Sequence, residues 1–259
     1  MPEITALFWV VKLATTAGGE ATSDYLALGS HLVGAVVEVG LLVIGLAWQF
    51  RTRRYTATAY WFLAYAIAIF GTGASDTLHL TFGIPYAGTT VLWAVVLAAV
   101  FFFWYRAEGT LSIHSIVTRR REQYYWATVF VTFALGTALG DFTATTLGLG
   151  YLSSVVLFAV AIMIPLVAWR FGANAVGAFW AAYVITRPLG ASIADYVSKP
   201  RSISGAGFGD GRTALVVTAA VAAGVAYLAI SRADIQPDQA DGGRPGGQSG
   251  EQPVRAAGT

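Results

Sequence analysis

Residues 125–141 read YWATVFVTFALGTALGD, and this stretch decides the fold because the chain contains four related forms of it. An aromatic residue and a tryptophan open the stretch, a glycine follows the tryptophan by ten residues, and an aspartate follows it by fifteen. The other forms are FWVVKLATTAGGEATSD at 8–24, YWFLAYAIAIFGTGASD at 60–76 and FWAAYVITRPLGASIAD at 179–195. Four copies in one register indicate a tandem repeat. The repeated positions are Trp9, Trp61, Trp126 and Trp180; Gly19, Gly71, Gly136 and Gly190; and Asp24, Asp76, Asp141 and Asp195.

The composition around these repeats is that of a membrane protein. Apolar residues make up 56% of the 259 residues and charged residues only 12%, about half the usual globular share. So few charges would not cover the surface of a soluble protein. Continuous apolar runs such as 155–168 lack the alternation of a membrane β-barrel. About eight helical spans are expected, near 5–25, 31–50, 57–78, 86–105, 123–143, 151–170, 174–195 and 212–231.

The Trp-Gly-Asp register resembles a bacterial membrane-protein family that is defined by a tandem repeat of unknown function. In that family each repeat holds two transmembrane segments and a characteristic tryptophan. The resemblance covers roughly residues 5–231 and implies an all-α integral membrane protein, with repeats at about 5–50, 57–105, 123–170 and 174–231. It supplies no catalytic or binding residues. Residues 232–259 are rich in Gly and polar residues, and we predict a disordered cytoplasmic tail there.

Two spans per repeat mean that all four repeats enter the membrane in the same direction. Such parallel repeats are related by an axis along the membrane normal, and we expect the odd-numbered helices to meet at that axis. Most arginines fall on one side of the predicted spans, which the positive-inside rule assigns to the cytoplasm. Both termini should then be cytoplasmic in a multi-pass protein of the cell's inner membrane. These arginines are Arg51, Arg53, Arg54, Arg106, Arg119, Arg120, Arg121 and Arg170.

The repeated tryptophans and glycines have ordinary structural interpretations. Tryptophan is enriched where a membrane helix meets the headgroups, so the four tryptophans are interpreted as an interfacial belt. Small residues let membrane helices approach closely, so the four glycines are interpreted as packing positions.

The repeated aspartates admit two accounts, because charged groups inside membranes face a partner or a cavity. In one account they hold hairpin turns; in the other they converge on a cation or a proton path. Glu20 lies four residues before Asp24 and shares its helix face. Glu38 lies in the middle of the second span, either as a proton-linked acid or as a paired core acid. The pair Arg187-Pro188 should break the seventh span and place a counter-charge near the midplane.

We therefore predict a secondary transporter or channel-like protein for a small cation or a proton-coupled solute. The alternative is a structural or sensory membrane protein in which the aspartates stabilise turns. A divalent metal site at Asp76 and His79 is a weaker hypothesis, since a hydrogen-bonded loop histidine explains the same spacing. Phosphate-loop, nucleophile-elbow and zinc-protease motifs are missing. Neither an enzyme, a cofactor nor a nucleic-acid partner is expected.

Overall fold

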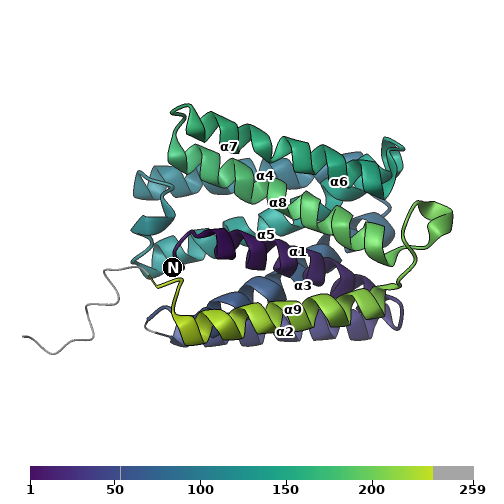
Figure 1. Ribbon diagram of the computed structural model, residues 1–259, viewed down its shortest axis with the longest axis horizontal. Helices are drawn as coiled ribbons and strands as arrows, with labels where there is room; N and C mark the ends of the chain where they lie inside the picture. The colour runs from purple at the N-terminus through teal and green to yellow at the C-terminus, as the bar shows by residue number, and fades with distance from the viewer. Residues whose placement is uncertain (53, 236–259) are drawn as a thin grey trace, which may run out of the picture.

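A computed structural model describes residues 1–52 and 54–235, which form an all-helical protein. Its long helices run side by side along the molecule (Figure 1). Among the described residues, six spans are long and apolar enough to cross a membrane, namely α2, α3, α4, α5 with the turn after it, α6 with α7, and α9. This is two fewer than the eight spans expected, because α1 and α8 do not meet that criterion. The helices are α1 (Ala6–Ala27), α2 (His31–Arg51), α3 (Ala57–Leu80), α4 (Tyr86–Glu108), α5 (Arg119–Asp141), α6 (Gly150–Ala161), α7 (Met163–Arg170), α8 (Ala175–Ser198) and α9 (Asp210–Ser231).

The helices form two concentric layers. The first helix of each repeat (α1, α3, α5 and α8, here the inner helices) packs against its two neighbours, and α8 returns to α1. The outer layer consists of α2, α4, α6 with α7, and α9. Each outer helix packs mainly on the inner helix of the following repeat, so α2 covers α3, α4 covers α5, α6 covers α8, and α9 covers α1. The last repeat thereby closes the ring on the first.

The repeated glycines set the spacing of the inner ring. A methyl group on Gly19 would overlap Ala68, and one on Gly71 would overlap Phe133. In each case the partner lies seven residues after the tryptophan of the next repeat. A methyl group on Gly136 would overlap Arg187, and one on Gly190 would overlap Thr16, which lie seven residues after Trp180 and Trp9. The same contact is therefore made between all four neighbouring pairs of inner helices. The interpretation of these glycines as packing positions is confirmed.

The repeated aromatic residues form a layer at the end where the inner helices begin. Each aromatic residue before a tryptophan approaches the tryptophan of the next repeat. Because Trp61, Trp126 and Trp180 are all buried, the expected interfacial belt is wrong for these three residues. They fill the core between the inner helices and do not face the headgroups. The ring centroids are 5.5 Å apart for Phe8–Trp61, 5.2 Å for Tyr60–Trp126, 6.2 Å for Tyr125–Trp180 and 5.8 Å for Phe179–Trp9.

Two spans differ from the expectation. The seventh span does not break, because α8 runs continuously through Arg187 and Pro188. Membrane helices tolerate proline where neighbouring groups satisfy the freed backbone. The sixth span is instead divided at Ile162 into α6 and α7, just before Pro165. The two ends of the described chain meet at the aromatic layer's end of the bundle, where the Glu3 amide donates to the Asp234 carbonyl at 2.8 Å. The predicted disorder of residues 232–259 is wrong for residues 232–235, which are ordered at this end of the bundle with Asp234 buried. The rest of the predicted tail, from 236 onward, lies outside the described residues.

Candidate functional site

A buried ion pair lies between the inner helices. Arg187 on α8 donates to Glu20 Oε2 on α1 at 2.7 Å, and the two residues are 0% and 3% exposed. Thr72 on α3 and Thr137 on α5 each donate to the same carboxylate oxygen at 2.9 Å. All four inner helices therefore contribute to one polar network.

The repeat explains why these side chains meet. Glu20, Thr72 and Thr137 each follow their repeat's tryptophan by eleven residues, and the ring brings this position to the centre three times. The fourth repeat has Ala191 at that position, and Arg187 from one turn earlier provides the polar group instead. Its side chain fits because Gly136 on α5 has no side chain of its own. Arg187 thus provides the counter-charge to a buried acid.

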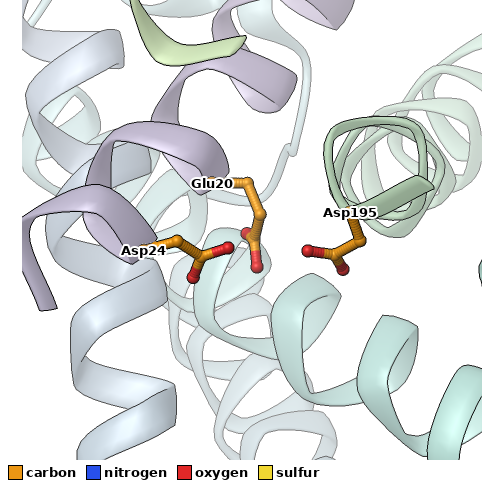
Figure 2. Close-up of side chains that lie close together, drawn as sticks. All are labelled: Glu20, Asp24 and Asp195. Carbon is orange, nitrogen blue, oxygen red and sulfur yellow. The ribbon is translucent and has the colours of Figure 1, made fainter. Parts of the chain in front are cut away.

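The acid of this ion pair, Glu20, also belongs to a group of three converging carboxylates. Glu20, Asp24 and Asp195 each offer an oxygen atom, and these atoms lie within 4.8 Å of one another. Figure 2 shows the carboxylates of Glu20 and Asp24 on α1 facing that of Asp195 on α8. We call these three residues the carboxylate group. Carboxylate oxygens are the ligands preferred by hard cations such as Mg²⁺, Ca²⁺ and Mn²⁺.

Asp195 is the unpaired member of the carboxylate group. It is 3% exposed, and among the described residues its carboxylate forms neither a hydrogen bond nor an ion pair, although the charge of Lys199 still acts on it. The buried hydroxyls of Ser192 and Ser198, one turn to either side on α8, also have no hydrogen-bond partner among the described residues. Because buried polar atoms are normally hydrogen-bonded, this face of α8 has an unused capacity to bind a polar ligand.

A family model matches most of the chain at residues 7–55, 59–110, 124–173 and 178–234. Its description is Repeat of Unknown Function (DUF347). The chain belongs to this repeat family. No curated protein and no solved structure matches the chain. Membership of the repeat family confirms the four tandem copies and supplies no activity, so the site has to be judged from its geometry.

The carboxylate group has a lysine, Lys199, at its edge. Lys199 directly follows α8 and donates to Asp24 at 2.7 Å, and it also lies 3.4 Å from Asp210 at the start of α9. Burial works to lower the pKa of Lys199, but the carboxylates of Asp24 and Asp195 raise it above its ordinary value. The ammonium group is therefore charged at neutral pH and neutralises part of the group.

The other predicted acids lie outside the carboxylate group. Asp76 on α3 and Asp141 on α5 are half-buried at the same end of the ring, and no cation pairs with either among the described residues. Glu38 on α2 is buried and accepts from Ser23 at 2.7 Å, with its carboxylate against Gly73. His79 stacks on Tyr86 with 3.7 Å between ring centroids, and its Nδ1 lies 2.8 Å from the Ile84 carbonyl oxygen. His79 therefore contacts the turn between α3 and α4, as the hydrogen-bonded loop histidine in the sequence analysis would.

Proposed function

We propose that this protein moves a small cation across the membrane along the axis of the inner helices, with the carboxylate group as the binding site. The observation that carries the proposal is the convergence of Glu20 and Asp24 on the unpaired, buried Asp195. An unpartnered ionisable group inside a membrane protein is a functional-site candidate because its burial is costly. Transport on ion gradients fits the missing nucleotide-binding motifs.

The polar groups on the axis support a path that continues from the carboxylate group. Glu20 belongs to that group and also contacts Arg187, Thr72 and Thr137, which extend the polar groups along the inner helices. A cavity of about 1020 Å³ lies at the opposite end, lined by residues including Gln49, Thr56, Thr118 and Glu122. By the positive-inside rule, the arginines listed above support a cytoplasmic position for this cavity.

A structural role is the alternative, and one contact favours it. Lys199 bonds Asp24 and reaches Asp210, and so ties the end of α1 to the segment between α8 and α9. If the carboxylates serve only to hold these segments, replacing them should weaken the fold without changing any response to ions.

Asp195→Asn is expected to abolish stabilisation by the bound cation, because it removes the one ligand of the group that forms no ion pair among the described residues. The measurement is thermal unfolding of the purified protein in chloride salts of Na⁺, K⁺, Mg²⁺, Ca²⁺ and Mn²⁺. A cation that binds only the folded state stabilises it by about 2.7 kcal/mol at a hundredfold excess over its dissociation constant.

Asp141→Asn is the matched control, since Asp141 holds the same repeat position on α5 and lies outside the carboxylate group. We expect one ion to stabilise the wild type and Asp141→Asn, and to leave Asp195→Asn unchanged. No response of the wild type to any ion, together with a less stable Asp195→Asn variant, would favour the structural role.

A further inference from the structure

Lys12 on α1 is a buried cation that neither the ion pair nor the carboxylate group uses. Its side chain is 2% exposed, and Nζ has no hydrogen-bond partner among the described residues. Nζ lies 3.7 Å from the centroid of the Tyr183 ring and 5.3 Å from that of Phe133. Contacts with ring faces stabilise a desolvated ammonium by about 2 kcal/mol. An unpaired charge at this depth costs more than that.

The position of Lys12 places it on the axis. Lys12, Thr16, Glu20 and Asp24 follow one another at four-residue intervals, so they lie on one face of α1. The first three are buried, and Asp24 is half-buried. The stripe extends for about 18 Å along the helix at 1.5 Å per residue. It therefore covers more than half of the roughly 30 Å hydrocarbon core of a bilayer.

Lys12 lies between the two ends of the proposed path. On one side, at about 12 Å along α1, is Glu20 with its ion-pair partner Arg187. On the other side is the aromatic layer, in which the hydroxyls of Tyr60 and Tyr125 hydrogen-bond to each other. The large cavity follows beyond this layer, lined by Tyr55, whose ring centroid is 5.8 Å from that of Tyr60.

The charge balance on the axis depends on the protonation state of Lys12. Arg187 and Glu20 neutralise each other as a pair. A protonated Lys12 adds one positive charge that no acid among the described residues pairs with. A cation that enters the axis would meet both Arg187 and the ammonium of Lys12, and like charges in a medium of low dielectric repel strongly. Loss of one proton from Lys12 removes one positive charge as the cation brings its own.

We propose that Lys12 releases a proton when the cation occupies the axis and takes one up when the cation leaves, so that the protein exchanges the cation for protons. In each cycle one N–H bond at Nζ breaks, its electron pair stays on the neutral amine, and the proton passes to water on one side of the membrane. The same lone pair later accepts a proton from water on the other side. The proposal rests on the proposed function and names its coupling ion.

The groups that surround Lys12 set its titration, and they come from every inner helix. Tyr183 and Arg187 face it from α8, and Glu20 lies on α1 itself. Tyr60 on α3 and Tyr125 on α5 form the adjacent layer. Along α9, which packs against α1, no ionisable residue occurs between Arg212 and Tyr227, and Tyr227 is exposed.

The test uses purified full-length protein in liposomes that contain a pH-sensitive dye, with inward gradients of Na⁺ or Mn²⁺. We expect the wild type to alkalinise the lumen, because protons leave as the cation enters, and acidification would contradict the exchange. The methionine of Lys12→Met has no proton to release. Arginine is effectively always charged, so Lys12→Arg cannot release its proton. Both variants should lose the proton movement, whereas a merely structural lysine would be replaced successfully by one of the two. Arg170→Met, which removes an exposed cation at the end of α7, should keep it.

The measurements distinguish failure of the role of Lys12 from failure of the proposed function. Cation uptake without proton movement in the wild type, or proton movement that persists in Lys12→Met, overturns the role of Lys12 and leaves the proposed function standing. A wild type that moves neither ion overturns the proposed function itself. Thermal stabilisation by the cation should survive in both Lys12 variants, because the carboxylate group is intact. If both variants fail to fold, Tyr183→Leu keeps the amine and removes the ring against it; an unchanged pH profile of exchange then counts against the proposal.

Discussion

Arg187→Met is expected to lower the free energy of unfolding by about 3–5 kcal/mol, because it leaves Glu20 as a buried charge without its ion-pair partner. Arg187 is 0% exposed, and one of its terminal nitrogens donates to Glu20, Thr72 and Thr137. The other donates to the Thr16 carbonyl at 3.4 Å, so a single substitution removes four hydrogen bonds. Denaturant unfolding of the purified protein in detergent measures the loss.

The double variant Glu20→Gln with Arg187→Met is the control for this prediction. It removes both charges, and replacing both partners of a buried pair is often neutral. Most of the lost stability should therefore return. A single Arg187→Met variant as stable as the wild type would contradict the role of Arg187 as the counter-charge of Glu20.

Gly19→Ala should destabilise the protein by about 1–3 kcal/mol, the usual cost of overpacking a close-packed interior. The added methyl group would overlap both the Cβ atom and the backbone of Ala68, and a backbone cannot swing aside as a long side chain can. The substitution therefore forces α1 away from α3 and opens the ring that brings the polar groups together. The measurement is again the unfolding free energy.

Gly40→Ala provides the matched comparison. Gly40 lies within α2, and a methyl group there would meet no atom within 4 Å. The same substitution should be neutral or should stabilise by about 0.5–1 kcal/mol, since alanine favours a helix interior over glycine. Equal effects at Gly19 and Gly40 would show that the repeated glycine does not set the distance between the inner helices.

Part of this architecture could be predicted because the repeat can be recognised from residue spacing alone. The fixed spacing of tryptophan, glycine and aspartate predicted four parallel units, central odd-numbered helices and close packing at the glycines. It did not predict which residue each glycine meets, since contacts between repeats depend on how the ring closes in three dimensions. Three of the four tryptophans were misinterpreted for a related reason: a residue that suits the headgroup region also suits a buried aromatic layer.

The candidate site was less predictable because its members are far apart in the sequence. Thr72 and Thr137 are 52 and 117 residues from Glu20, and nothing local to either threonine indicates that contact. Equal repeat positions also suggested four equivalent aspartates, whereas only Asp24 and Asp195 join Glu20 in the carboxylate group. The division between α6 and α7 did have a local signal in Pro165, which lacks the backbone donor of a regular helix.

The central claim is that the carboxylate group binds a cation that then crosses the membrane. Its most direct test is uptake of the stabilising cation into liposomes that contain the wild type, Asp195→Asn or Asp141→Asn. The account predicts uptake by the wild type and by Asp141→Asn, and background levels with a folded Asp195→Asn variant. Equal uptake by the wild type and Asp195→Asn, or background levels with all three proteins, would contradict it.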